Sequence, residues 1–336
     1  MRGPHNIWRL ARTAATFERT GASKVVLDAV DAPPLLRLAV RTFGWPLRWL
    51  GLKGDPNTPP VLRALTALGP AYIKFGQLLS TRADVVGADL ASELRVLQDR
   101  LPPFSTALAK AEFEKEIGKA ASEVFSDFSE PVAAASIAQV HKATMKGAGQ
   151  RVAVKVLRPN IERAFAKDID AFYFAARMVE ILSPSTRRLH PLDVIEHFEG
   201  IVLGELDLRL EGAAAAEFAS TTERDADFSV PAVNWELSAR RVMTLDWVDG
   251  IPLNDIDAID AAGIDKTELG NKVLQLFLSH ALRDGYFHGD MHQGNLKVGP
   301  EGNILALDFG IMGRIDEYTR RVYAEIFPSG PTFRFP

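Results

Sequence analysis

Four polar residues of the chain have the types and the order of a phosphate-handling site. Lys155 stands alone in the apolar run VAVKV, Asp290 and Asn295 share the turn-rich segment HGDMHQGN, and Asp308 follows an apolar run in LDFG. A carboxylate such as Asp290 can accept or orient a hydroxyl proton, whereas an amide oxygen and a second carboxylate suit a Mg²⁺ ion that bridges phosphates. We therefore predict that Asp290 is catalytic and that Asn295 and Asp308 bind the metal. Lys155 is then the contact to the nucleotide phosphates.

The segment before Lys155 lacks the GxGxxG sequence that often covers nucleotide phosphates, and the alanine-rich VAAASIAQV stands in its place. Alanine disfavours positive φ and adds a methyl group where glycine would let an amide approach phosphate. We expect a stiffer loop that grips the terminal phosphates differently; taken alone, the segment would instead be a plain turn or a helix start. Five of its residues are assigned to nucleotide binding: Ala133, Ala134, Ala135, Ser136 and Ala138.

The elements that must position these residues follow from apolar spacing. The pattern over 61–117 is helical, with a break at a Pro-Pro pair. Two β-type runs at 138–143 and 152–157, joined by the turn-like KGAGQ, predict a hairpin. Because side chains alternate along a strand, Lys155 and Ala153 share one face of the second run.

The rest of the chain alternates helical and β-type patterns. Helices are predicted over three ranges: 161–182, 193–218 and 266–284. A β-type run spans 241–248, and the backbone of Asp246 and Val248 is our candidate for the hinge contact to adenine. A short apolar strand, ILALDFG, leads to Asp308. Helices with small, paired strands predict an α+β protein with two lobes.

Composition limits the class of protein. At about 150 residues per domain, a chain of 336 residues is long enough for two domains or lobes, and 47% hydrophobic residues indicate a folded protein. The net charge of −4 argues against broad binding of nucleic acid, and the absence of cysteine excludes disulfides, thiol catalysis and Cys-ligated zinc. The sequence shows no apolar run of about 18 residues and no secretory signal. We expect a cytoplasmic enzyme or binding protein without a transmembrane helix.

Residues 35–50, LLRLAVRTFGWPLRWL, differ from the rest of the chain. They combine apolar positions with three arginines and two tryptophans: Arg37, Arg41, Arg48, Trp45 and Trp49. A basic amphipathic helix of this kind could lie peripherally on an inner membrane surface. The alternative is a helix packed on the main domain, with arginine stems covering apolar surface.

Several motifs together resemble the UbiB (AarF) family of atypical kinases, which serve ubiquinone metabolism. The resemblance covers about 60–320. LGPAYIKFGQLLSTRADVV contains a KxGQ motif with Lys74 and Gln77, and LQDRLPPF follows it. GELDLRLEG supplies an ExD motif as Glu205 and Asp207, and the alanine-rich segment, VAVKV, HGDMHQGN and LDFG complete the set in order.

The resemblance implies a protein-kinase-like fold whose N-terminal helical extension packs over the active site. It implies binding of ATP or ADP with Mg²⁺, ATPase activity, restrained protein phosphorylation, and a role in ubiquinone biosynthesis. Possible partners are then a lipid or quinone-precursor ligand, the membrane and other ubiquinone-biosynthesis proteins. By the same resemblance, Glu205 would pair with Lys155, and Asp207 would belong to the nucleotide site.

Lys74 is predicted to act in turnover, together with Gln77. A helix places the two residues on one face, in an apolar frame that gives the lysine little reason to be solvated. A partly desolvated lysine needs a carboxylate partner. The candidates are Asp207 and Glu211, and Asp207 is preferred because it belongs to the ExD motif.

The sequence departs from the family pattern at a few places. Gln293 stands where the family commonly has proline, and Gly289 stands where many kinases have an arginine that pairs with a phosphorylated activation loop. The chain ends soon after Gly310, so we expect a truncated C-lobe. Four divisions are predicted: an amphipathic arm and linker (1–58), the helical KxGQ extension (59–130), a kinase-like N-lobe with inserted helices (131–248), and a partial C-lobe with the catalytic and DFG motifs (249–336).

Two other functions remain open. A small-molecule phosphotransferase of the aminoglycoside or choline kinase type also uses a loop like HGDMHQGN, although the KxGQ and ExD motifs weigh against it. A nucleotide-binding scaffold without turnover is favoured by the alanine-rich segment. The phosphoryl acceptor is not specified by the sequence.

Overall fold

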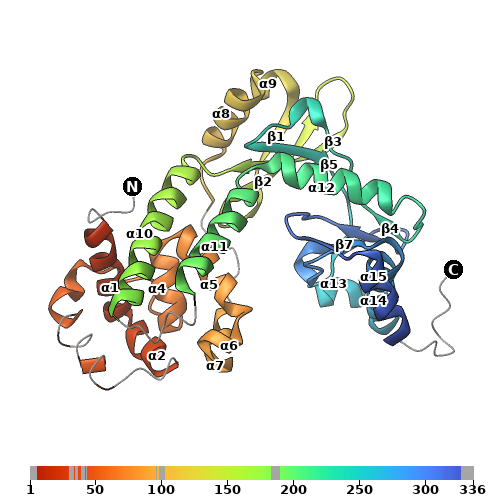
Figure 1. The fold of residues 1–336 in the computed structure, drawn as a ribbon. Helices are drawn as coiled ribbons and strands as arrows, with labels where there is room; N and C mark the ends of the chain where they lie inside the picture. The colour runs from red at the N-terminus through yellow and green to blue at the C-terminus, as the bar shows by residue number, and fades with distance from the viewer. Residues whose placement is uncertain are drawn as a thin grey trace. The chain divides into compact units, whose positions relative to one another are not determined.

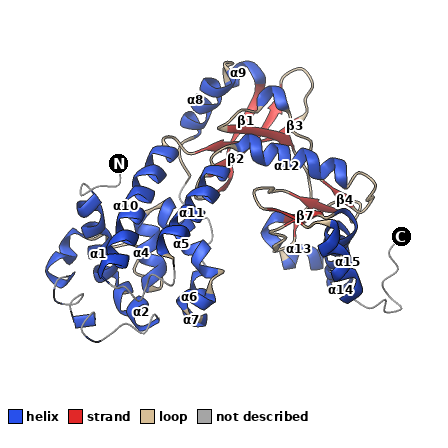
Figure 2. Cartoon of the chain, in the orientation of Figure 1, coloured by secondary structure: helices blue, strands red, loops and turns tan. Residues whose placement is uncertain are grey.

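The computed structural model describes residues 6–29, 44–95, 103–182 and 190–326, together with 34, 37, 38, 42 and 97. The chain forms two compact units whose segments interleave along the sequence. The first unit comprises Met1–Ser105, Ala133–Gln139 and Leu157–Leu206, and the second comprises Thr106–Val132, Val140–Val156 and Asp207–Pro336. The first unit is largely helical, whereas the second combines sheets with helices (Figures 1 and 2).

The first unit begins with α1 (Ile7–Thr20), which packs against the 3-10 helix η2 (Trp45–Leu50). Gly51 permits this close approach, because a Cβ at that position would lie 2.3 Å from the Ala15 carbonyl oxygen. Among the described residues, the helices that follow in this part of the unit are α2 (Ala22–Ala29), α4 (Pro60–Leu68), α5 (Pro70–Ser80), α6 (Ala83–Val86) and α7 (Ala88–Leu94).

Two helices from later in the chain complete the first unit. α10 (Ile161–Leu182) and α11 (Pro191–Glu205) pack against each other, and α10 also contacts α1 and α5. Aromatic rings join them, with centroids 4.9 Å apart for Tyr72 and Phe172 and 5.3 Å apart for Phe75 and Phe198. Such pairs contribute about 0.5–1.5 kcal/mol each beyond their buried area. This aromatic cluster fixes α5, the helix that carries Lys74.

Most of a four-stranded sheet belongs to the second unit. Its strand order is β1-β2-β3-β5, formed by β1 (Phe125–Ala134), β2 (Ala138–Met145), β3 (Arg151–Leu157) and β5 (Val242–Asp246). Helices α8 (Thr106–Ile117) and α12 (Leu208–Thr221) both contact β5, and the short α9 (Ala121–Val124) precedes β1. Arg241 Nε lies 3.0 Å from Glu112 Oε2, so a largely buried ion pair ties α8 to the start of β5.

The second unit also contains two smaller sheets. One has the order β4-β9-β8-β6 and the other pairs β10 with β7. Their strands are β4 (Phe228–Ser229), β6 (Ile251–Pro252), β7 (Tyr286–His288), β8 (Leu296–Val298), β9 (Ile304–Ala306) and β10 (Met312–Arg314). The accompanying helices are α13 (Ile256–Ala261), α14 (Lys266–Ser279) and α15 (Glu317–Ile326), with 3-10 turns η4 (Trp235–Leu237) and η6 (Gln293–Asn295) and a π turn, η5 (His280–Asp284). A buried core that includes Phe218, Phe228 and Phe309 holds these elements together.

Most of the predicted elements are confirmed. The hairpin is β2–β3, and the helix predicted over 161–182 has those limits. The continuous helix predicted over 193–218 is wrong, because the chain breaks at Leu206 and Asp207 between α11 and α12. The helix predicted over 266–284 ends at Ser279 and continues as the π turn. The ten-residue strand β1 was missed because all but one of its residues are exposed or half-buried and give no apolar alternation.

Only part of the arm at 35–50 lies within the described residues. Arg37 Nη1 lies 2.7 Å from Asp28 Oδ1, and Trp49 is 71% exposed on η2. Arg41 lies outside the described residues, as does the side chain of Trp45.

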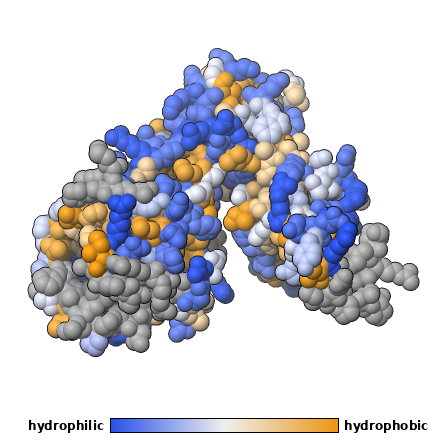
Figure 3. Space-filling view, in the orientation of Figure 1, coloured by the Kyte–Doolittle hydropathy of each residue, from blue (hydrophilic) through white to orange (hydrophobic). Residues whose placement is uncertain are grey.

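Hydrophilic side chains cover most of the face drawn in Figure 3, with apolar ones between them. Among the helices searched, all within the described residues, none is long and apolar enough to cross a bilayer.

Candidate active site

Lys155 lies on β3, on the face opposite the alternate, fully buried valines of that strand. Its Nζ is 2.6 Å from Glu211 Oε1 and 3.1 Å from Asp308 Oδ2. Burial by itself lowers the pKa of Lys155, but the two carboxylates outweigh burial and raise the pKa above its ordinary value. The ammonium group is therefore kept charged in a largely buried position, where it can meet a phosphate.

The partner of Lys155 is Glu211, so the pairing with Glu205 expected from the resemblance is wrong in this structure. Glu205 is the last residue of α11, whereas Glu211 lies in the first turn of α12. The break comes at Asp207, whose carboxylate accepts a hydrogen bond from the Arg209 amide at 3.2 Å and caps α12. Because the break places the two glutamates on different helices, Glu211 pairs with Lys155 and Glu205 pairs with a different lysine.

Glu205 pairs with Lys74, within the first unit. Lys74 Nζ lies 2.9 Å from Glu205 Oε2, and both side chains are largely buried. The preferred Lys74–Asp207 pair is thus wrong, since Asp207 Oδ2 binds Arg209 Nη2 at 2.6 Å. Its hydrogen bond with the Arg209 side chain lowers the pKa of Asp207. A nucleotide contact of Asp207 stays a prediction.

Gln77 and Gly76 fit α5 to its neighbours in the first unit. Gln77 Nε2 donates a hydrogen bond to the Leu97 carbonyl oxygen at 3.0 Å. A Cβ at Gly76 would lie 2.6 Å from Leu97 Cδ1 and 2.8 Å from Leu65 Cδ1, so a larger residue would displace these two leucine side chains. A catalytic role of Gln77 stays a prediction.

Asp308 follows β9, whose three residues are all buried. Its Oδ1 accepts a hydrogen bond from the Gly310 amide at 3.0 Å, while Oδ2 faces Lys155. The Phe309 amide also bonds the Glu211 carboxylate, and Phe309 itself is buried. The LDFG segment is thus anchored by its phenylalanine while 45% of the Asp308 side chain remains exposed.

The loop that carries Asp290 is joined to the LDFG segment by His288. The His288 Nδ1 accepts a hydrogen bond from the Asp290 amide at 3.0 Å, so the proton lies on Nε2, which donates to the Asp308 carbonyl oxygen at 2.5 Å. Leu307 and Asn295 are joined by a backbone hydrogen bond of 3.0 Å. Burial lowers the pKa of His288, which favours this neutral form.

The structure brings Asp290 and Asn295 together, as predicted. Asn295 Nδ2 donates hydrogen bonds to the Asp290 carbonyl oxygen at 3.1 Å and to Asp290 Oδ2 at 3.3 Å. The amide oxygen of Asn295 is the acceptor that a cation would use, and Asp308 supplies a carboxylate. Within the described residues, no three His, Asp or Glu side chains form a ready-made metal cage. This donor set fits Mg²⁺, which prefers one or two protein oxygens completed by phosphate and water.

The candidate hinge groups are partly occupied. The Asp246 amide donates to the Ala232 carbonyl oxygen at 2.9 Å, and the Asp246 carboxylate accepts from Gln150 Nε2 at 2.7 Å. The Val248 carbonyl oxygen accepts from Lys297 Nζ at 3.4 Å. An adenine contact from the Asp246 amide would require its bond to Ala232 to break, and the roles of the Asp246 carbonyl oxygen and of Val248 stay predictions.

The alanine-rich segment belongs to the first unit and joins β1 to β2. The Ala135 amide donates to the Ala138 carbonyl oxygen at 2.8 Å, and Arg158 Nη2 donates to the Ala135 carbonyl oxygen at 2.9 Å. Ser136 is fully buried, and its hydroxyl has no hydrogen-bond partner among the described residues. An unpaired buried hydroxyl carries a free-energy cost that a ligand could relieve. Nucleotide contacts of Ala133, Ala134 and the rest of the segment stay predictions.

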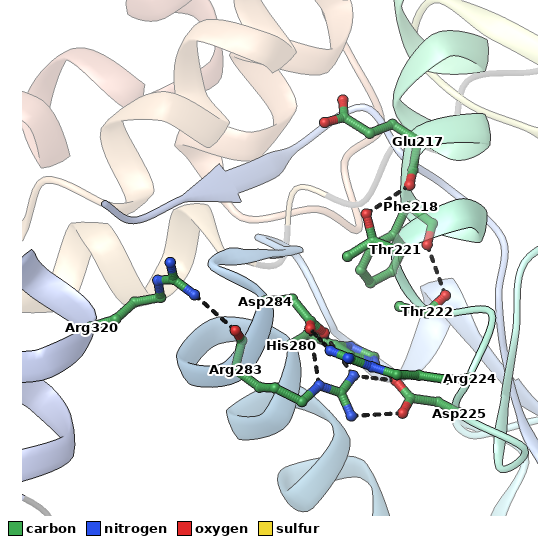
Figure 4. A network of polar contacts seen from close by, with 10 residues as sticks. All are labelled: Glu217, Phe218, Thr221, Thr222, Arg224, Asp225, His280, Arg283, Asp284 and Arg320. Carbon is green, nitrogen blue, oxygen red and sulfur yellow. Dashed lines mark hydrogen bonds and ion pairs between the residues drawn. The ribbon is translucent and has the colours of Figure 1, made fainter. Parts of the chain in front are cut away.

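A polar network anchors the π turn η5, which leads to β7 (Figure 4). Asp225 accepts hydrogen bonds from Arg283 Nη1 and Nη2 at 2.8 and 2.6 Å, and His280 Nε2 lies 3.2 Å from Asp225 Oδ2. Arg320 Nη1 donates to the Arg283 carbonyl oxygen at 2.7 Å. Since Gly285 then turns the chain at φ 71°, this network fixes where β7 begins.

Sequence reasoning missed two residues of this site. His288 lies two positions before Asp290, and this spacing within HGDMHQGN could have indicated a supporting histidine. Glu211 was considered only for Lys74. The signal for its role was the Asp207 cap, which starts a new helix between the two glutamates.

Comparisons with known proteins show the family and the fold. A family model described as the ABC1 atypical kinase-like domain matches residues 96–330. The chain is 39% identical over 257 residues to a Marinobacter nauticus protein named "Probable protein kinase UbiB", an alignment that covers 75% of this chain and 47% of that protein. A solved complex of Rv3197 with erythromycin, from Mycobacterium tuberculosis, is similar with a TM-score of 0.53 and 30% identity, covering 63% of this chain and 53% of that one. The chain thus spans about half the length of these relatives.

Proposed function

The chain belongs to the ABC1 atypical kinase-like family, which includes UbiB, and from this premise we propose that it is an atypical kinase or ATPase that supports ubiquinone biosynthesis. It would bind ATP or ADP with Mg²⁺ through residues of the second unit. The observation that carries the proposal is the ion-pair cluster of Lys155, Glu211 and Asp308.

Lys155 binds the nucleotide phosphates in this mechanism. Glu211 holds the lysine from α12, and its short, largely buried contact keeps the ammonium group in one place. Asp308 contacts the same ammonium group but remains nearly half exposed, so it can turn toward an incoming ligand. Charged hydrogen bonds between an ammonium group and phosphate are about twice as strong as neutral ones.

Asn295 and Asp308 would hold Mg²⁺ beside the phosphates. When bound, the ion supplies positive charge that offsets the charge developing on the transferred phosphoryl group. The hydrogen bond from Gly310 fixes one oxygen of Asp308, and the contact with Asp290 fixes the amide of Asn295. Both ligands are therefore oriented by the chain itself.

Asp290 orients the nucleophile, which is either water or a substrate hydroxyl. Its side chain is 43% exposed, so a hydroxyl can reach it, while His288 fixes its backbone from below. A carboxylate in this position accepts the hydroxyl proton as the oxygen attacks.

Lys74 and Glu205 support a second part of the proposal, that turnover is restrained by the first unit. A largely buried lysine–glutamate pair adds little stability relative to apolar residues, so we infer a functional role for this pair. We assign to this pair the control of which acceptor is phosphorylated, with protein acceptors disfavoured. A lipid or quinone-precursor ligand and ubiquinone-biosynthesis proteins are the partners in this proposal.

The exposed Trp49 supports weak, peripheral contact of the same protein with an inner membrane. A tryptophan with Arg48 beside it suits the headgroup region of an anionic bilayer. Vesicle co-sedimentation of the wild type and of Trp49→Ser tests this, and equal recovery of the two proteins would exclude a role of Trp49.

The test of the main proposal measures nucleotide binding and phosphate release on one preparation, for the wild type and for Lys155→Met. We expect Mg²⁺-dependent binding and slow phosphate release by the wild type, both weakened in the variant. Binding without release would indicate the scaffold, and rapid phosphorylation of amino-alcohol or sugar substrates would indicate a small-molecule phosphotransferase. Equal nucleotide affinity of the two proteins would contradict the assigned site.

A further inference from the structure

A cavity of about 740 Å³ lies within the first unit. It is formed by the start of α1, the end of α4, α5 and the start of α10. Its volume falls within the range of about 300–1,000 Å³ that is typical of small-molecule sites. None of the residues assigned to the nucleotide lines it.

The lining is strongly basic. Four cations contribute to it, namely Arg9, Arg12, Arg163 and Lys167, against one acid, Asp168. Arg9 is bound to Asp168 by an ion pair. Among the described residues, the other three cations have no ion pair. The cavity therefore holds an excess of positive charge that the chain itself does not neutralise.

Helix periodicity places these charges on facing surfaces. Arg163 and Lys167 are four residues apart on α10, and Arg9 and Arg12 are three apart on α1, so each pair shares one face of its helix. The buried Asn6 side chain also bonds Asp170 Oδ2 at 2.9 Å, which ties the start of α1 to α10. The fold thus gathers four cations from two helices around one cavity, with a single acid among them.

The rest of the lining supplies an apolar wall and a hydroxyl pair. Tyr72 and Thr13 share a hydrogen bond of 2.7 Å between their hydroxyl oxygens, and burial raises the pKa of Tyr72 to about 12, so the phenol stays neutral. Leu52 and Leu68 line the cavity nearby. Asn160, at its edge, adopts a left-handed φ of 57°, a conformation that is uncommon outside glycine.

We propose that this cavity binds the phosphate or diphosphate group of a ligand whose apolar part lies against Leu52 and Leu68. Three unneutralised cations match an anion with two or more negative charges better than a single carboxylate. Two of the three are arginines, whose planar forks bind phosphate oxygens in pairs. The cations are exposed enough for a ligand to enter, so binding should weaken as salt is added.

The test is calorimetric titration of the full chain with inorganic pyrophosphate at low salt. We expect Arg12→Gln and Arg163→Gln each to weaken binding at the cavity about fivefold to tenfold, because each removes one charged hydrogen-bond donor. Arg177→Gln is the matched control, since Arg177 is an exposed arginine of α10 that does not line the cavity. It should bind as the wild type does. Any binding at the nucleotide site is common to all of these proteins.

A variant with the opposite sign sharpens the test. Asp168→Asn removes the one acid of the lining and releases Arg9, so it should tighten pyrophosphate binding. Thermal melting of each variant checks that it is folded. Pyrophosphate affinity that is the same in the wild type, Arg12→Gln and Arg163→Gln, or weaker in Asp168→Asn, would overturn the proposal.

Vesicles of phosphatidylcholine with and without phosphatidic acid identify the source of the phosphate. Co-sedimentation that requires phosphatidic acid and is lost in Arg163→Gln would assign the site to a lipid headgroup. Co-sedimentation unchanged in Arg163→Gln, with pyrophosphate binding lost, would assign it to a soluble ligand. Both outcomes support a phosphate site. If Arg163→Gln retains both its co-sedimentation with phosphatidic acid and its pyrophosphate binding, the proposal is contradicted.

Discussion

Two lysine–glutamate pairs, one in each unit, can be compared directly. Lys155 and Glu211 are 16% and 10% exposed, and Lys74 and Glu205 are 17% and 15% exposed. The pairs are thus nearly equal in burial. Lys155 belongs to the second unit, where a further carboxylate, that of Asp308, lies 3.1 Å from its Nζ.

The carboxylate of Asp308 makes the Lys155 cluster the one suited to a ligand. We expect changes to Lys74 or Glu205, in the first unit, to alter folding stability and turnover rather than nucleotide affinity. Lys155, Glu211 and Asp308 together carry one excess negative charge, which a cation beside Asp308 would offset. The same pair of residue types is therefore expected to serve nucleotide binding in the second unit and control of turnover in the first.

The largest effect is expected from reversing one charge of the Lys74–Glu205 pair. Lys74→Glu places two carboxylates in a largely buried position and should lower the free energy of unfolding by about 3 kcal/mol. The double variant Lys74→Glu, Glu205→Lys should recover much of this, since the pair can re-form. Urea denaturation of the three variants measures both effects. A double variant no more stable than the worse single one would contradict the pairing.

Asp308→Asn should weaken Mg²⁺-dependent nucleotide binding by more than about tenfold, because a metal-bridged phosphate contributes several kcal/mol. Binding measured in EDTA should change much less, since the lysine remains. Titration of the same protein with and without Mg²⁺ gives both values. If Mg²⁺ strengthens binding to the variant as much as to the wild type, Asp308 is not a ligand of the metal.

Acid should weaken the second unit through His288. Burial lowers the pKa of His288 in the folded state, so the unfolded chain binds more protons once the pH falls below about 6.5. Stability is therefore fully present above that pH and is lost toward the folded-state pKa, by at most about 1.4 kcal/mol per pH unit for one histidine. His288→Gln should show a shallower loss between pH 7 and pH 5.5 in denaturant titrations. An unchanged slope would mean that His288 is not held neutral.

Glu211→Gln and Glu205→Gln test which glutamate serves the nucleotide. We expect Glu211→Gln to weaken nucleotide binding about fivefold, because Lys155 loses a charged partner that orients it. Glu205→Gln should leave nucleotide affinity unchanged while it alters turnover. Fluorescent-nucleotide titration measures the affinity, and a phosphate-release assay measures turnover. Weaker nucleotide binding in Glu205→Gln, with unchanged binding in Glu211→Gln, would favour the Lys155–Glu205 pairing that the resemblance implied.

The smallest effect is expected from the alanine-rich segment. Ala134→Gly and Ala135→Gly should shift the ratio of ATP to ADP affinity about threefold toward ATP, because glycine gives a phosphate-covering loop more freedom in φ. The wild type should bind ADP at least as well as ATP. Competition binding of the two nucleotides measures the ratio, and a wild type that already prefers ATP strongly would count against this.

The family and the α+β, protein-kinase-like fold were predicted correctly from the sequence, because they depend on local signals. Alternation in VAVKV and the turn before it determined the hairpin and the face of Lys155. The order of Asp290, Asn295 and Asp308 was enough to indicate one site, and the structure links them by hydrogen bonds through His288.

Only the tertiary structure decided which carboxylate meets which lysine. Glu205, Asp207 and Glu211 lie close in sequence, and no periodicity tells them apart until a helix ends at Glu205 and another starts from the Asp207 cap. The basic cavity shows the same limit, because α1 and α10 are far apart in the chain and each alone presents an ordinary charged face. Ion pairs and cavities depend on the packing of distant segments, whereas strands, caps and motifs depend on neighbouring residues.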